Sequence, residues 1–169
     1  MGVNDRASHA WGGRRTARTE TMYREGGAAY VYLIYGIYSC MNVTAGEAGC
    51  AEAVLLRACI PAGGGELLLC NLRRNSRRRA LPERAEEVTG REWAKLLDGP
   101  GRLCGAMGIT RADNGADLVT SDDFFLRDDG FVPGEILCRP RIGIDYAGEA
   151  KDYPWRVPAA GIRGKSGGR

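Results

Sequence analysis

The fold is decided by one apolar stretch, AYVYLIYGIYSCMNV at residues 29–43. Tyr, Val and Ile are enriched in β-strands, so this composition predicts strand structure. Gly36 interrupts the stretch near its middle, where a glycine indicates a bulge or a tight hairpin turn. The surrounding apolar run, Ala28 to Val43, falls short of the roughly 20 residues that a membrane helix needs.

The segments on either side predict a mixed domain. Residues 4–27 are polar and rich in glycine, which indicates a long loop. We interpret the near-continuous apolar run at 53–60 as a second strand, buried on both faces, and Arg139–Ile144 as a late strand. Helices are predicted over Glu66–Leu72, Pro82–Leu97 and Arg102–Ile109. Because helices and strands do not alternate as in βαβ units, the fold class is α+β.

Length and composition bound the class of protein. The 169 residues are 44% hydrophobic and 27% charged, which is typical of a soluble globular domain and excludes a disordered chain. The 25 glycines follow no Gly-X-Y period, so collagen is excluded as well. We assign one domain to residues 1–157 and a disordered tail to 158–169. The first six residues hold no apolar signal core, which predicts a cytoplasmic protein.

The cysteines do not form a metal-binding pattern. All six lack a Cys-x-x-Cys partner, and the chain holds a single histidine, so no zinc site is predicted. Reduced, mostly buried thiols are the better interpretation.

Charge is distributed unevenly along the chain. Residues 1–79 carry eleven arginines against six acidic residues, a balance of +5, whereas residues 80–169 carry thirteen basic and fifteen acidic residues, a balance of −2. The first half is therefore the candidate for an anionic partner such as nucleic acid. An alternative is that arginine, which outnumbers lysine 21 to 3, stands in for surface lysines in a GC-biased coding sequence.

Four residues have polar or aromatic side chains that the core of the fold does not by itself explain. Arg57 lies inside an apolar run, where it forms a structural ion pair or faces a pocket that handles an anion or a bound water. Tyr32 and Tyr35 lie just before Gly36 and are either core tyrosines or aromatics that wedge into a base stack or stack against an extruded base. Asn42 is suited to contact a base edge or to cap a turn.

Seven short motifs follow one another in an order that identifies a family. They are DRASH at 5–9, GGRRT at 12–16, YVYLIYG at 30–36, CMNV at 40–43, AVLLRA at 53–58, GPGRL at 99–103 and RIG at 141–143. In this order they resemble the alkyladenine, or 3-methyladenine, DNA glycosylase family of animals and bacteria. The resemblance covers roughly residues 5–156.

The resemblance implies a fold and an activity. Members have a single compact α+β domain with a curved, mostly antiparallel sheet, flanking helices and a protruding β-hairpin that enters the DNA minor groove. They are monomeric, monofunctional hydrolases of base-excision repair that flip an alkylated purine nucleotide out of double-stranded DNA, after which water displaces the base at the sugar C1′. No metal or organic cofactor takes part, and a bacterial member would work at the nucleoid in the cytoplasm.

The resemblance also assigns roles in base binding to residues of this chain. Tyr35 matches the tyrosine that fills the gap left in the duplex. Tyr32 and His9 match residues that enclose the flipped base. Asn42 matches the side chain whose bulk opposes the 2-amino group of normal guanine.

Further roles concern the attacking water and the DNA backbone. Arg57 and the carbonyl of Ile142 match the groups that hold the water. Arg14, Thr16 and Arg102 match contacts to the DNA backbone, with Arg102 at a position where the family usually has lysine.

One family element is missing from the sequence. The family's general base is a glutamate in a Glu-Ala-Tyr segment shortly ahead of the DRASH motif, and neither Asp5 nor Glu20 occupies the matching position. We expect a chain truncated at its N-terminus, with either a true start upstream or a remnant that binds damage without excising it. A DNA-damage-binding protein without hydrolase activity is the alternative. A helix–hairpin–helix glycosylase is disfavoured, since Gly99-Pro100-Gly101 is its only support.

Overall fold

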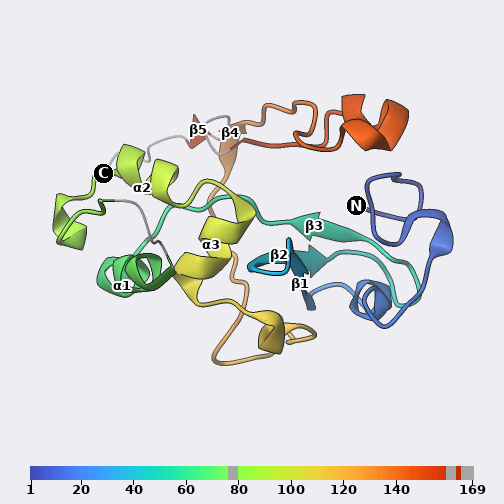
Figure 1. The fold of residues 1–169 in the computed structure, drawn as a ribbon, viewed down its shortest axis with the longest axis horizontal. Coiled ribbons are helices and arrows are strands. Elements are labelled where there is room, and N and C mark those ends of the chain that lie inside the picture. The colour runs from blue at the N-terminus through green and yellow to red at the C-terminus, as the bar shows by residue number, and fades with distance from the viewer. Residues whose placement is uncertain (76–79, 159–162, 165–169) are drawn as a thin grey trace.

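A computed structural model describes residues 1–75, 80–158 and 163–164 of the chain (Figure 1). At its centre lies an antiparallel sheet with the strand order β1–β2–β3, formed by β1 (Ala29–Ile34), β2 (Tyr38–Thr44) and β3 (Ala53–Leu55). The pairing of β1 with β2 across a turn at residues 35–37 confirms the predicted strand structure, and of the two alternatives at Gly36, a bulge or a tight turn, the structure has the turn.

The α-helices follow the sheet in sequence and complete the α+β class. They are α1 (Gly65–Asn75), α2 (Gly90–Leu96) and α3 (Pro100–Met107). The helices predicted at 66–72 and 102–109 are thereby confirmed with small shifts. The helix predicted over 82–97 is wrong in its first half. Thr89 caps α2 by accepting a hydrogen bond from the Glu92 N–H, while the Glu92 carboxylate accepts one from the Thr89 N–H, so the helix cannot begin earlier.

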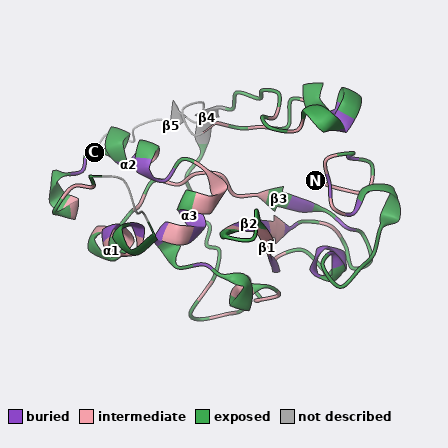
Figure 2. Cartoon of the chain, in the orientation of Figure 1, coloured by how far each residue is buried: buried purple, intermediate pink, exposed green. Residues whose placement is uncertain are grey.

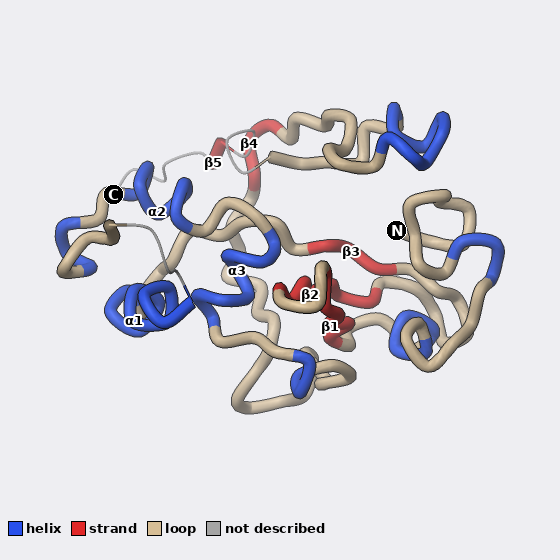
Figure 3. The backbone as a smooth tube through the Cα atoms, in the orientation of Figure 1, coloured by secondary structure: helices blue, strands red, loops and turns tan. Residues whose placement is uncertain are grey.

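Loops and short 3-10 helices make up much of the remaining chain (Figure 3). The 3-10 helices are η1 (Trp11–Gly13), η2 (Glu20–Tyr23), η3 (Ala85–Glu87), η4 (Arg111–Asp113) and η5 (Asp145–Asp152). The segment at 4–27 is a loop interrupted by η1 and η2, which agrees with its polar composition.

Different parts of the chain cover the two faces of the central sheet. Val31 and Met41 point to one face and pack with Cys104 of α3 in a buried cluster. On the other face Tyr30 packs with Met22 of η2. Figure 2 shows buried segments in the strands, in α3 and in the N-terminal region. The N-terminal segment is therefore held directly against one face of the sheet.

The strand predicted over residues 53–60 is shorter and more exposed than expected. Only Ala53–Leu55 is a strand, and the Val54 side chain is exposed. In the described sheet β3 is an edge strand whose only strand neighbour is β2, so its run is not covered as a central strand would be. After the bond from the Leu56 N–H to the Met41 carbonyl, at 3.0 Å, the chain leaves the sheet.

The strand predicted over Arg139–Ile144 is wrong. Arg139 exchanges two backbone hydrogen bonds with Arg156, at 2.8 and 3.0 Å, as an isolated bridge. Pro140 has no N–H to extend the ladder, and Gly143 adopts a φ of +75°, which bends the chain away. A two-stranded sheet forms instead from β4 (Pro133–Glu135) and β5 (Arg163–Gly164).

The cysteine prediction is wrong in one respect. All six thiols are free, but only Cys40 and Cys104 are buried; Cys59 and Cys70 are half-buried, and Cys50 and Cys138 are exposed. Within the described ranges no group of three potential metal ligands comes together, and no helix there is long and apolar enough to cross a membrane. Most of the tail predicted at 158–169 lies outside the described residues.

Candidate functional site

One face of the sheet gathers aromatic and polar side chains. Tyr30 pairs with Asn42, and Tyr32 pairs with Cys40, across β1 and β2. Directly opposed residues of antiparallel strands point to the same face, as do residues two apart on one strand. Tyr30, Tyr32, Cys40 and Asn42 therefore share the face that lies opposite α3.

His9 joins this face from the N-terminal loop. Its Nδ1 lies 2.8 Å from the Tyr30 hydroxyl oxygen. The His9 ring stands edge-on to Tyr32, with the ring centroids 4.6 Å apart at an interplanar angle of 82°, and the Tyr30 and Tyr32 centroids are 5.4 Å apart. The structure thus brings together His9 and Tyr32, and it adds Tyr30 as their shared neighbour.

The three rings are uncharged at neutral pH. Burial raises the pKa of Tyr30 and of Tyr32 above the ordinary tyrosine value. Burial lowers the pKa of His9, and the nearby charge of Arg18 lowers it further. Neutral aromatic rings present electron-rich faces, which attract cations and stack with flat ligands.

Asn42 is completely buried on the same face, with 0% of its surface exposed. Its Nδ2 donates to the Tyr30 carbonyl at 3.1 Å. Its Oδ1 has no hydrogen-bond partner among the described residues. Burying an acceptor without a donor lowers the free energy of unfolding by about 1–3 kcal/mol. Asn42 therefore keeps its buried Oδ1 at the expense of folding stability.

Arg57 lies just beyond the end of β3 and is half-buried. Its backbone carbonyl accepts a hydrogen bond from the Gly99 N–H at 2.8 Å, which anchors the segment to the start of α3. Its guanidinium forms no ion pair within the described part of the chain, so a structural ion pair finds no support there. The charge of Arg57 acts on the Cys40 thiol, whose pKa is raised by burial and lowered by this charge. The strand register sets Leu55 opposite Asn42, and Arg57 follows Leu55 by two residues.

A buried ion pair joins two distant segments. Arg141 donates two hydrogen bonds to the Asp5 carboxylate, at 2.6 and 2.8 Å, and a third to the Ala150 carbonyl at 3.0 Å. Asp5 is 1% exposed. Burial alone would raise the pKa of Asp5, but the hydrogen bonds from Arg141 and from the Ala7 N–H hold the pKa below its ordinary value. Asp5 is thus a carboxylate held ionised by its partner.

This ion pair positions Ile142 relative to His9. Ile142 directly follows Arg141, and its side chain is 63% exposed, so the residue contributes its backbone and little packing. Asp5 lies four residues before His9 in the same loop. The ion pair therefore links the residue that precedes Ile142 to the loop that carries His9.

The turn between β1 and β2 holds a strained aromatic residue. The Ile37 N–H donates to the Ile34 carbonyl at 3.2 Å, and the two central residues, Tyr35 and Gly36, have φ values of +53° and +72°. Positive φ at both central positions defines a type I′ turn, which favours Asn-Gly. Among the described residues Tyr35 is the only non-glycine with positive φ, and its side chain is 85% exposed.

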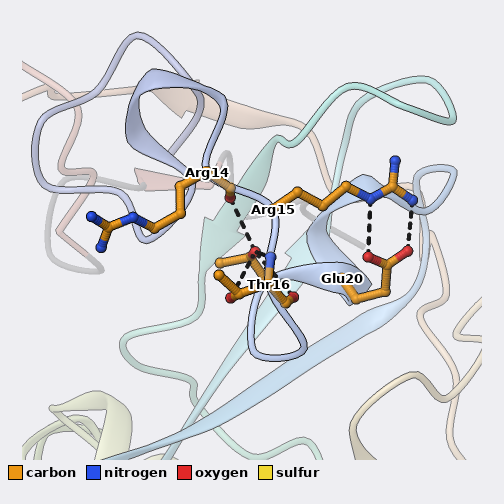
Figure 4. Close-up of polar contacts among 5 residues, drawn as sticks. Arg14, Arg15, Thr16 and Glu20 are labelled. Carbon is orange, nitrogen blue, oxygen red and sulfur yellow. Dashed lines mark hydrogen bonds and ion pairs between the residues drawn. The ribbon is translucent and has the colours of Figure 1, made fainter.

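Arg14 and Thr16 lie on a compact turn ahead of η2 (Figure 4). The Thr19 hydroxyl accepts a hydrogen bond from the Thr16 N–H at 2.8 Å and lies 3.1 Å from the Arg14 carbonyl, to which it donates. Arg15 donates two hydrogen bonds to the Glu20 carboxylate, at 2.6 and 2.9 Å. The Arg14 guanidinium points away from these contacts in Figure 4 and stays exposed.

Arg102 extends from the start of α3, close to the strained turn. Gly101 packs on Tyr38, the first residue of β2, so closely that an added Cβ would stand 3.1 Å from the Tyr38 Cβ. This contact docks the N-terminus of α3 on the base of the turn that carries Tyr35. The exposed Arg102 side chain donates to the Lys95 carbonyl at 3.3 Å.

Comparison with known proteins decides the family. The profile described as "Methylpurine-DNA glycosylase (MPG)" matches residues 1–162. The chain belongs to this family. It is 44% identical over 155 residues to a provisionally named 3-methyladenine DNA glycosylase of Clostridium acetobutylicum, a match that covers 92% of this chain and 71% of that protein. A provisionally named protein of the same kind from Methanocella arvoryzae is 43% identical over 156 residues, covering 92% and 70%.

Membership in the methylpurine-DNA glycosylase family confirms the resemblance found in the sequence. The chain is a member of a family of DNA repair hydrolases that act on alkylated purines. A third relative, from Alkaliphilus oremlandii, is 42% identical over 156 residues, with 92% of this chain and 73% of that protein covered.

Sequence reasoning assigned no role to Arg18 or Arg141, and it did not pair Asp5 with Arg141. Arg18 lies over the Tyr32 ring, with 5.3 Å between the guanidinium carbon and the ring centroid. Arg141 and Asp5 form the ion pair described above. The signal for Arg18 was its place in an arginine-rich loop near His9, but sequence alone does not indicate which arginine turns inward. Arg141 and Asp5 stand 136 positions apart, and no local pattern links them.

Proposed function

We propose that this chain flips an alkylated purine nucleotide out of duplex DNA and holds its base at the His9–Tyr32 cluster while water cleaves the N-glycosidic bond. The observation that carries the proposal is the uncharged aromatic cluster beside a half-buried arginine that has no ion pair among the described residues. Alkylated purines are often cationic and poorly paired, so they leave the stack at lower cost and bind well to aromatic faces.

In this proposal the β1–β2 turn protrudes from a curved sheet and enters the minor groove. Tyr35 fills the space left by the flipped nucleotide. Two features support this role: the ring of Tyr35 is exposed, and its backbone is held in a conformation that costs an L-residue about 1–2 kcal/mol. Ile37, also exposed at the turn, adds apolar surface of the kind that wedges between base steps.

Asn42 serves as the gate against normal guanine. Its side chain is held by the bond to the Tyr30 carbonyl and is fully covered in the DNA-free protein, so in this proposal the side chains that cover it move aside when a base enters. A base that carries an exocyclic 2-amino group would meet this rigid side chain, whereas an adenine-derived base would not. Discrimination then follows from bulk at a fixed position.

Cleavage requires an oriented water. In this proposal Arg57 holds the water as a donor and the Ile142 carbonyl holds it as an acceptor. The water oxygen bonds to C1′, the C1′–N bond breaks with its electron pair going to the base, and a cationic alkylated base leaves as a neutral molecule. The proton lost by the water goes to a general base, which contributes on the order of 10²–10⁴-fold.

The carboxylates that flank His9 in sequence are not free to act as this base. Asp5 is bound by Arg141, and Glu20 is bound by Arg15. This observation favours a second candidate function for the polypeptide of residues 1–169, namely binding of DNA damage without excision. The Met1 and Ala53 backbones exchange hydrogen bonds at 2.7 and 2.8 Å in antiparallel fashion. A Glu-Ala-Tyr segment placed ahead of Met1 would therefore run along β3 toward Arg57.

Contacts to the sugar–phosphate backbone complete the proposal. Arg14, Thr16 and Arg102 bind phosphates on either side of the flipped nucleotide. We further propose that residues 1–157 work as one domain, that the protein acts as a monomer, and that it acts at the nucleoid in the cytoplasm. The electrostatic part of this binding is salt-dependent and carries no sequence information.

The test is equilibrium binding to three duplexes that differ at one position: an alkylated purine, an abasic-site analogue and the normal purine. Wild-type protein is expected to prefer the first two to the third. Tyr32→Leu is expected to lose the preference for the alkylated base over the abasic analogue while it still binds the abasic analogue. Retention of that preference in Tyr32→Leu would overturn the role of the aromatic cluster.

A further inference from the structure

Arg18 already occupies the aromatic site in the DNA-free protein. Its guanidinium carbon lies 5.3 Å from the Tyr32 ring centroid, over the ring. One of its terminal nitrogens lies 3.3 Å from His9 Nε2. Across the residues that the structure describes, Arg18 forms no ion pair with a carboxylate. Its guanidinium instead contacts two neutral groups, the Tyr32 ring and the His9 imidazole.

The contact to His9 fixes which histidine nitrogen carries the proton. A guanidinium only donates hydrogen bonds, so His9 Nε2 must accept. The proton of the neutral ring is then on Nδ1, which donates to the Tyr30 oxygen at 2.8 Å. Arg18 thus engages the one nitrogen of His9 that Tyr30 leaves free, together with the face of Tyr32.

We propose that Arg18 is a specificity-determining residue that lowers the preference of this site for cationic bases relative to neutral ones. The proposal rests on the proposed function, because it takes the His9–Tyr32 cluster to be the place where the flipped base binds. The guanidinium lies over the Tyr32 ring, which is where a cationic base would bind. Any entering base must displace it, but only a positively charged base is also repelled by the displaced guanidinium, which stays tethered beside the site.

The positive charge of Arg18 makes the site distinguish cationic from neutral bases, whereas the displacement of Arg18 from the ring does not. Moving Arg18 off the ring costs the same for every base, so it lowers affinity for all of them. Two positive charges a few ångströms apart near a protein surface repel by an amount that, after screening by salt, corresponds to roughly a tenfold change in an equilibrium constant. Neutral bases do not experience this repulsion.

The experiment measures dissociation constants of the full 169-residue chain for duplexes that hold one cationic base without a 2-amino group, 3-methyladenine, one neutral base, hypoxanthine, or an abasic-site analogue. Nucleotides modified at the sugar 2′ position resist hydrolysis and keep each duplex intact. For Arg18→Gln we expect the ratio of affinities, cationic over neutral, to rise roughly tenfold. Arg18→Lys, which keeps the charge, should leave the ratio near the wild-type value.

Arg14→Gln is the matched control. Arg14 is an exposed arginine of the same loop, and its guanidinium lies over no aromatic ring among the residues that the structure describes. Its substitution should weaken binding of all three duplexes by the same factor and leave the ratio unchanged. An unchanged ratio in Arg18→Gln would overturn the proposal, as would an equal rise in Arg14→Gln.

A measurement without DNA keeps the proposal separate from the function on which it rests. His9 is the only histidine, so its NMR titration is unambiguous. Removal of the Arg18 charge should raise the pKa of His9 in Arg18→Gln and not in Arg14→Gln. An unmoved titration would overturn the contact itself. If wild-type protein binds neither base better than the abasic analogue, the base-holding function fails instead, whatever the titration gives.

Discussion

Tyr35 provides the sharpest separation between stability and function, because its substitution by asparagine should move the two in opposite directions. Tyr35 sits in a type I′ turn with a φ of +53°, a conformation that costs most L-residues about 1–2 kcal/mol and that asparagine tolerates. The ring is 85% exposed, so its loss removes little buried apolar surface. Tyr35→Asn should therefore stabilise the protein by about 1 kcal/mol, which raises the Tm by about 2–4 °C for a chain of this size.

Binding should respond in the opposite sense. Stacking of a base on an aromatic side chain is worth about 1–3 kcal/mol, so Tyr35→Asn should weaken binding to a duplex with one alkylated purine by about 5- to 150-fold. The slope of affinity against salt should stay the same, because the substitution leaves the proposed phosphate contacts of Arg14 and Arg102 in place. Fluorescence anisotropy at several salt concentrations measures both quantities.

Tyr35→Phe is the matched control for this substitution. It keeps the ring and the strained backbone, so neither the Tm nor the affinity should change appreciably. A lower Tm for Tyr35→Asn together with an unchanged affinity per folded molecule would make Tyr35 a structural residue and refute the wedge.

Three further predictions concern the site. In Asn42→Ser, binding to duplexes that present guanine-type bases should strengthen in a competition titration while affinity for an abasic analogue stays constant; equal gains for both would remove Asn42 as the gate. Asp5→Ala should lower the free energy of unfolding in urea by about 3–5 kcal/mol, because it leaves Arg141 buried without its partner. Glu20→Gln removes the carboxylate of an exposed ion pair and should lower the same free energy by at most about 1 kcal/mol. The folded protein holds the pKa of His9 below 6.5, so below that pH the unfolded chain binds more protons than the folded one. The contribution of His9 to the free energy of unfolding is therefore complete above pH 6.5 and declines as the pH falls. His9→Gln should flatten this decline in urea unfolding, and a profile that keeps its slope would contradict the burial of a neutral imidazole.

Local sequence signals account for the elements that bring the site together. The β-branched and aromatic residues around Gly36 predict the strand structure, and the glycine restricts its position to a bulge or a tight turn, because each feature acts within a few residues. The apolar spacing after Arg102 likewise indicates a helix, although α3 begins two residues earlier, at Pro100. Placing His9 and Tyr32 at one site came from the family resemblance, since 22 intervening residues lie between them.

Features that depend on distant partners could not be read from the sequence. Arg139–Ile144 has strand-forming residues, yet its backbone finds a partner only at Arg156, so no ladder forms. Arg18 was one of several arginines in a polar loop, and its contact with Tyr32 arises only when that loop packs on the sheet. Burial of Asp5 depends on an arginine at the other end of the chain.

The most direct test of the account is single-turnover release of an alkylated adenine from a duplex, measured for the polypeptide of residues 1–169 and for the same polypeptide with Glu-Ala-Tyr directly ahead of Met1. Both should bind the damaged duplex more tightly than the undamaged one. Only the extended form should release the base, faster by about 10²–10⁴-fold, the contribution of a general base. Rapid release by residues 1–169 alone would contradict the account and assign the role of base to a carboxylate within the chain; failure of both forms to prefer damaged DNA would contradict base binding at the His9–Tyr32 cluster.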